Sequence, residues 1–175
     1  MYEIRIHCRG GEGGVTAARL IALAAFRDGR YAMAWPFYGA ERRGAPVVSF
    51  VRIDDRPIRV YSQISNPDLV VVLDPTVMDV VDVYHGLKPG GIVLLNAPGA
   101  GQVPGHRTYT VDLTGIALTL NLVIAGSPVL DTSVVGAVAK LGIIAMDSAK
   151  RAVAEMFPDE RNVRAAEAAY QGLVV

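Results

Sequence analysis

The sequence has very few cysteines: Cys8 is the only one among 175 residues. A single thiol cannot form a disulfide within the chain, and it cannot supply the four thiolates that ligate an iron–sulfur cluster. Cys8 ends an alternating polar and apolar run, a position typical of a small buried hydrophobe. We therefore expect this chain to hold no redox cluster of its own.

Side chains suited to catalysis or metal binding are also scarce. The three histidines do not have the H-x-x-x-H spacing of a metal site: His7, His85 and His106. No serine occupies a G-x-S-x-G turn, and no Gly-Asp-Gly sequence opens a diphosphate–magnesium site. We predict neither a catalytic nor a metal-ligating residue in this chain.

The chain lacks both an excess of charge and a long apolar segment. Its 17 basic and 17 acidic residues cancel, so no electrostatic attraction to nucleic acid is expected. No apolar run reaches the roughly 18 residues of a membrane span, and no charged leader precedes a signal-type core. We expect a cytoplasmic protein without nucleic-acid or membrane partners. Because 51% of its residues are hydrophobic, other subunits are expected to cover part of its surface.

Strands and helices are predicted to alternate along one domain, residues 1–175. Strands are expected at 2–8, 31–38, 46–53, 57–62, 69–73, 92–95 and 108–111. Helices are expected at 15–28, 74–85, 112–121, 132–141, 148–157 and 162–171. Three of these helices are predicted to be capped by aspartates, namely Asp74, Asp112 and Asp131.

Two segments indicate the fold class. The run 69–73 is apolar without a break, which is typical of a strand buried on both faces of a parallel sheet. The segments 46–53 and 57–62 flank a polar turn and are predicted to pair as a hairpin. We predict a three-layer α/β/α sandwich with a mixed, mostly parallel sheet, Rossmann-like in arrangement.

A glycine-rich turn follows the first predicted strand, and it contains Gly10, Gly11, Glu12, Gly13 and Gly14. It is not a dinucleotide fingerprint, because Thr16 occupies the place of the last glycine in G-x-G-x-x-G. It is not a Walker loop either, because no Lys-Ser/Thr pair follows the glycines. Two interpretations stay open: a tight structural turn, or a surface that contacts a coenzyme or a partner. Glu12 would repel a phosphate at this helix start.

A second cluster places Arg42 and Arg43 between Gly39 and Gly44. Guanidinium groups suit bidentate binding of a phosphate, a carboxylate or an acidic patch on a neighbouring subunit. The alternative is a solvated loop in which Glu41 supplies the local counter-charge.

Both clusters resemble a known family, the gamma subunit of pyruvate/2-oxoisovalerate:ferredoxin oxidoreductases. This subunit is equivalent to the third domain of single-chain pyruvate:ferredoxin oxidoreductase. The resemblance runs nearly end to end, through residues 50–59, 62–68, 74–76, 90–92, 109–112, 136–137 and 157–158.

The resemblance implies a subunit of an enzyme that oxidatively decarboxylates a 2-oxoacid, with pyruvate as the expected substrate, with the help of coenzyme A. The products would be acyl-CoA, CO2 and reduced ferredoxin. Thiamine diphosphate and Mg2+ would lie between the alpha and beta subunits, and iron–sulfur clusters in other subunits, including a ferredoxin-like delta subunit. The chain alone would hold no cofactor and show no activity.

The resemblance also implies site residues, which would face coenzyme A or a partner subunit: Gly10, Gly11, Gly13, Gly14, Thr16, Arg42 and Arg43. Two positions depart from the family pattern, since Glu12 replaces a usual Gln and Asp131 an often-found Asn. The alternative function is a purely structural scaffold of the same or a related complex, without ligand contact. A stand-alone dinucleotide-binding protein is disfavoured by the broken fingerprint.

Overall fold

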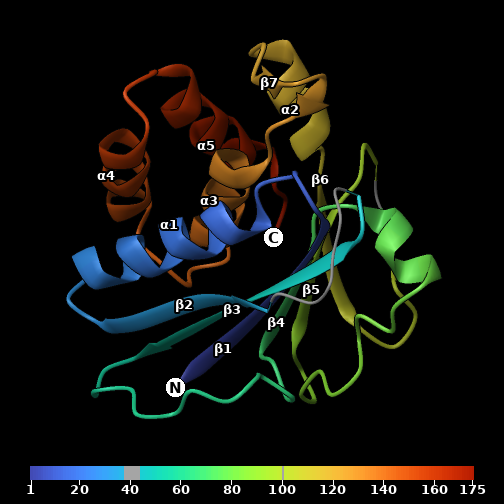
Figure 1. The fold of residues 1–175 in the computed structure, drawn as a ribbon, viewed down its shortest axis with the longest axis vertical. Coiled ribbons are helices and arrows are strands. Elements are labelled where there is room, and N and C mark those ends of the chain that lie inside the picture. Colours follow the sequence, from blue (N-terminus) through green and yellow to red (C-terminus); the bar gives the residue numbers. More distant parts are fainter. Residues whose placement is uncertain (38–43, 100) are drawn as a thin grey trace.

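The structure is a computed structural model that describes residues 1–37, 44–99 and 101–175. Its main sheet has the strand order β2-β3-β1-β4-β5-β6 (Figure 1). The strands are β1 (Tyr2–Arg9), β2 (Tyr31–Phe37), β3 (Pro46–Asp54), β4 (Leu69–Val72), β5 (Ile92–Asn96) and β6 (Arg107–Val111). β3 is antiparallel to both of its neighbours, whereas β1, β4, β5 and β6 pair in parallel. The predicted mixed, mostly parallel sheet is confirmed.

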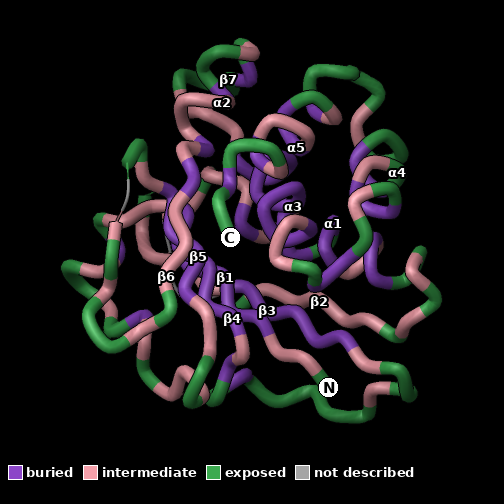
Figure 2. Tube along the Cα trace, turned by 180° about the vertical axis from the view of Figure 1, so that it is seen from behind, coloured by how far each residue is buried: buried purple, intermediate pink, exposed green. Residues whose placement is uncertain are grey.

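The helices gather on one face of this sheet (Figure 1). They are α1 (Gly14–Arg27), α2 (Leu113–Thr119), α3 (Asp131–Lys140), α4 (Met146–Met156) and α5 (Arg161–Gly172). A small hairpin of β7 (Val123–Ile124) and β8 (Ser127–Pro128) follows α2. Ile4, Ile6 and Cys8 alternate along β1 and enter the main core with α1, because side chains of a strand point to opposite faces in turn. Figure 2 shows the buried residues concentrated in the sheet and the helix faces above it.

Helices α3 and α5 approach each other closely because small residues line their contact. A Cβ placed on Gly136 would lie 1.8 Å from the carbonyl oxygen of Ala166. The neighbouring alanines Ala137, Ala165 and Ala169 are fully buried. The glycine at position 136 is therefore required by the close helix–helix approach.

The opposite face of the sheet carries a thin layer instead of α-helices. It consists of the 3-10 helix η1 (Pro75–Asp79), the turns that follow it, and an irregular segment, residues 55–63, which we name the strap. The apolar part of this layer is a small cluster around Val70, Val72 and Val77. Two arginines of the sheet, Arg5 and Arg52, supply its polar attachment.

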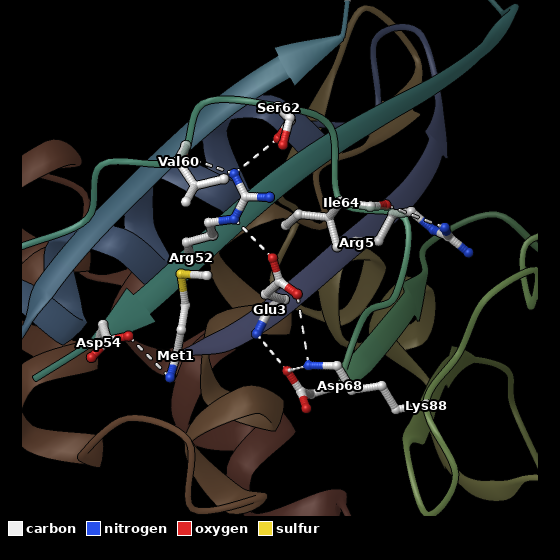
Figure 3. Close-up of polar contacts among 10 residues, drawn as sticks. All are labelled: Met1, Glu3, Arg5, Arg52, Asp54, Val60, Ser62, Ile64, Asp68 and Lys88. Atoms are coloured by element: carbon white, nitrogen blue, oxygen red, sulfur yellow. Dashed lines mark hydrogen bonds and ion pairs between the residues drawn. The ribbon is translucent and has the colours of Figure 1, made fainter.

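Arg52 attaches the strap to the sheet (Figure 3). Its Nη1 donates to the carbonyl oxygens of Val60 (2.8 Å) and Ser62 (2.9 Å). Its Nε donates to Glu3 Oε1 at 2.8 Å, so the buried guanidinium has a counter-charge. Lys88 lies 3.6 Å from the other oxygen of Glu3 and extends the network towards the solvent. Because only 2% of Arg52 is exposed, these partners are needed to compensate for the burial of its charge.

Arg5 attaches the turn after η1 in the same way. Its Nη2 donates to the carbonyl oxygens of Val83 (2.8 Å) and His85 (2.7 Å). Its Nε donates to His7 Nε2 at 3.0 Å, which requires a neutral imidazole. Burial, and then the charge of Arg5, lower the pKa of His7 to about 3. His7 is therefore a structural acceptor, and its neutral state is maintained throughout the physiological pH range.

Two sequence predictions on this face are wrong. Residues 57–62 do not form a strand, and the hairpin partner of β3 is β2. Both edges of β3 are already occupied, by β2 and β1, so no edge remains for residues 57–62. The predicted helix 74–85 is shortened to η1 followed by turns, although Asp74 does cap it through the amide of Thr76.

We expect Gly136→Ala to lower the free energy of unfolding by about 1–3 kcal/mol, because the new methyl group meets backbone atoms of α5. Gly172→Ala is the matched control, since no atom lies within 4 Å of the added Cβ. Urea denaturation of both variants measures the difference. Equal stabilities of the two variants would contradict the packing argument.

We expect Arg52→Met to cost about 2–4 kcal/mol of folding free energy, because two carbonyl oxygens lose their donor and the half-buried Glu3 keeps only the more distant Lys88 as counter-charge. Arg151→Met, at an exposed position of α4, should change stability by less than about 0.5 kcal/mol. Thermal unfolding followed by circular dichroism measures both variants. A loss below about 1 kcal/mol for Arg52→Met would show that the strap does not depend on this side chain.

Candidate functional site

The glycine turn connects β1 to α1 at the end of the sheet where the parallel strands reach their carboxyl termini. Gly11 and Gly13 adopt φ values of 100° and 88°, in the region that glycine enters without strain. Gly13 is the N-cap of α1. Thr16 lies half-buried in the first turn of the same helix. The structure therefore brings the predicted residues 10–16 together in one turn.

Two of the glycines are explained by packing inside the protein. A Cβ on Gly14 would lie 2.4 Å from Cys8 Sγ, and one on Gly13 would lie 2.9 Å from the Cβ of Asp131. Cys8 is buried, as predicted, and burial raises the pKa of its thiol to about 12. The structural interpretation of the turn thus accounts for Gly13 and Gly14. Gly11, by contrast, is exposed.

The second cluster lies beside the first where the structure describes it. Gly10 donates its amide to the carbonyl of Ala45 (2.9 Å) and accepts from the amide of Gly44 (3.2 Å). Arg9 also donates to the carbonyl of Gly44, at 2.9 Å. Arg42 and Arg43 lie outside the described residues. The end of the arginine loop and the glycine turn are therefore joined by three hydrogen bonds.

Carboxylates dominate the charge around the glycine turn. Glu12 accepts from the amide of Arg9 at 2.6 Å, and its carboxylate closes the turn on itself. Burial, and secondarily the nearby Asp74, raise the pKa of Glu12. The guanidinium of Arg9 is already engaged, by Asp74 at 3.2 Å and by Thr76. The turn therefore offers a phosphate no free positive charge among the described residues, and two carboxylates repel it.

Asp131 lies behind the turn, and its predicted capping role is wrong. The N-cap of α3 is Leu130, and Asp131 is instead the first residue of the helix. Only 4% of it is exposed, and its Oδ1 has no hydrogen-bond partner in the described part of the chain. Burial raises its pKa to about 6. By contrast, the cap predicted for Asp112 is confirmed by its bond from the amide of Gly115.

Sequence reasoning missed a groove farther along the same side of the molecule. It has a volume of about 1000 Å3 and lies between β6, α2 and α5, with Thr110, Ile116, Arg164 and Glu167 among its lining residues. Its lining residues are spread over several segments between residues 97 and 174, so no local sequence motif marks the groove. Asn96 organises this end of the sheet, because its side chain bonds the amides of Leu113 and Thr114 at the start of α2.

Among residues 1–37, 44–99 and 101–175, no cluster of three or more His, Cys, Asp or Glu side chains forms a metal site. Within the same residues, no helix combines the length and the apolar character needed to cross a bilayer.

Comparison with known proteins decides the family. Residues 3–172 match the model of the pyruvate ferredoxin/flavodoxin oxidoreductase family. The chain belongs to this family. It is 49% identical to the common gamma subunit of the pyruvate and ketoisovalerate oxidoreductases of Thermococcus kodakarensis, over 100% of this chain and 98% of that one. It is also 49% identical to the pyruvate synthase subunit PorC of Methanothermobacter thermautotrophicus, over 98% and 95%.

A solved relative has the same architecture. The pyruvate oxidoreductase subunit PORC of Thermotoga maritima superposes with a TM-score of 0.83 and 31% identity, over 99% of this chain and 97% of that one. The family resemblance inferred from the sequence is thereby confirmed, as is the assignment to a gamma-type subunit of an oxidoreductase.

We expect Asp131→Asn to raise stability at pH 7.5 by about 1–3 kcal/mol, by removing a buried charge. The folded-state pKa lies above the unfolded one, so the wild type loses stability as the pH rises from about 4 to about 6. The gain of the variant should therefore vanish near pH 4. Melting temperatures across this range test it, with exposed Asp79→Asn as the control. A gain that is independent of pH would refute the charge explanation.

Proposed function

We propose that this chain acts as the gamma subunit of a 2-oxoacid:ferredoxin oxidoreductase, with pyruvate as the expected 2-oxoacid, that forms acyl-CoA, CO2 and reduced ferredoxin. The observation that carries the proposal is the match to gamma subunits over essentially the whole chain. The side chains support it, because one buried thiol and no grouping of potential metal-ligating side chains among the described residues fit a chain whose redox chemistry lies on other subunits.

The partners would be alpha and beta subunits, which hold thiamine diphosphate and Mg2+, and an iron–sulfur delta subunit that passes electrons to ferredoxin. Thiamine diphosphate would supply the carbanion chemistry of decarboxylation, and the clusters would carry the electrons. The whole of residues 1–175 would form one domain of this cytoplasmic complex. This chain would contribute surface and positioning.

The edge formed by the glycine turn and the arginine loop is the proposed contact with coenzyme A or with a partner. The proposed residues are Gly10, Gly11, Gly13, Gly14, Thr16, Arg42 and Arg43. The described part of the turn fits an anion poorly, since Glu12 and Asp74 are both negative. A phosphate of the coenzyme would therefore depend on Arg42 and Arg43, and the turn itself would face an uncharged part of the coenzyme or a partner surface.

Arg42→Ala and Arg43→Ala in the assembled complex separate coenzyme binding from scaffolding. Loss of a guanidinium contact to phosphate should raise the KM for coenzyme A by about tenfold at unchanged assembly and unchanged KM for pyruvate. Steady-state ferredoxin reduction gives both constants, and native mass spectrometry gives the assembly. Arg151→Ala on the exposed surface of α4 is the control.

Loss of assembly with normal coenzyme kinetics in the residual complex would favour the purely structural scaffold. Failure of the wild-type chain to assemble with the alpha, beta and delta subunits at all would contradict the gamma-subunit assignment itself.

A further inference from the structure

Residues 57–61 of the strap are irregular, and they pair with no strand among the described residues. The carbonyl oxygens of Val60 and Ser62 both point to the same nitrogen, Arg52 Nη1 (Figure 3). In an extended segment the carbonyls of residues two apart point to the same side, and the shared donor Arg52 Nη1 fits that arrangement at residues 60–62. Arg52 thus fixes one edge of residues 60–62 against the sheet.

The other edge of the strap is free. In such an extended segment the amide and carbonyl of Arg59 and Tyr61 point away from Arg52. Within the part of the chain that the structure describes, the amides and carbonyls of Arg59 and Tyr61 have no hydrogen-bond partner. An open row of amides and carbonyls is the template to which another strand adds.

The side chains of the strap suit a covered strand better than a solvated loop. Val60 is 44% exposed and Tyr61 is 74% exposed, although both residue types favour strands. This is why the sequence predicts a strand at 57–62, and the sheet of this chain provides no place for it. The unused strand propensity and the free backbone edge coincide in the same residues.

The charges of the strap select the partner. Arg56 and Arg59 are exposed, and their guanidinium groups make no ion pair within the described residues. Asp55 is the only acidic residue among residues 55–63, so the strap carries a net charge of +1. Two copies of this strap would bring like charges together, which is destabilising across a strand pair. An acidic strand from a different protein is electrostatically complementary.

We propose that residues 57–62 form a docking edge that receives an extended, acidic segment of another subunit by β-strand addition. The inference rests on the proposed function, because it takes the partner from the oxidoreductase complex. Arg52 acts as the positioning residue that holds the docking edge extended before the partner binds. Holding the edge in advance reduces the entropy that ordering the strap would cost on assembly.

Hydrogen exchange tests the backbone contact directly. The peptide that spans Arg59 and Tyr61 should exchange rapidly in the isolated chain, and at least about tenfold more slowly in the assembled complex. Peptides of α4 around Arg151 provide an internal reference. An unchanged exchange rate in an assembled complex would overturn the docking edge while leaving the gamma-subunit assignment intact.

A charge reversal tests the partner chemistry. Arg59→Glu should weaken assembly with the other subunits by about tenfold or more at low salt, whereas Arg151→Glu should leave it unchanged. The melting temperature of each isolated variant shows whether the fold is retained. If the folded Arg59→Glu variant assembles like the wild type, the proposal of an acidic partner segment is wrong.

A photo-crosslinking amino acid at position 61 identifies what lies against the edge. The expected product joins this chain to an acidic segment of another subunit. A product that joins two copies of this chain, or a basic segment, would overturn the proposal. If neither variant nor wild type assembles with any subunit of the oxidoreductase, the proposed function fails instead.

Discussion

Two buried guanidinium groups hold the layer opposite the helices to the sheet. This layer contains little apolar area of its own, and its backbone carbonyls would otherwise face a buried sheet without donors. Arg5 satisfies carbonyls after η1, and Arg52 satisfies those of the strap. Glu3 balances the charge of Arg52, and His7 stays neutral beside Arg5. Removing either arginine therefore affects a whole layer, because several polar groups depend on each.

The glycine turn and the strap differ in chemistry. At the edge, the glycine turn is closed by Glu12 and packed against Cys8 and Asp131, so its shape is determined from inside the protein. It presents backbone and acidic charge outward. On the opposite face, the strap presents cationic side chains and an unpaired backbone edge. One chain thus carries two chemically different surfaces.

The sequence allowed most of the fold to be predicted, and the failures have physical causes. The six strands of the main sheet and the five α-helices are predictable, because local pattern and tertiary burial agree there. The strand predicted at 57–62 is absent because strand propensity does not say whether a sheet edge is available for pairing. The helix predicted at 74–85 is short because carbonyls after η1 bind Arg5 instead of continuing the helix.

The glycine turn was located correctly, whereas its inner contacts were not foreseeable, since Asp131 lies more than a hundred residues away in the sequence. We propose that this chain contributes contact surfaces, and no redox group, to its complex. The most direct measurement is iron and thiamine diphosphate content together with ferredoxin reduction, for the purified chain and for the complete complex. We expect neither cofactor and no turnover in the chain alone, and full activity once its partners are added. Stoichiometric iron or pyruvate-dependent electron transfer in the lone chain would contradict it.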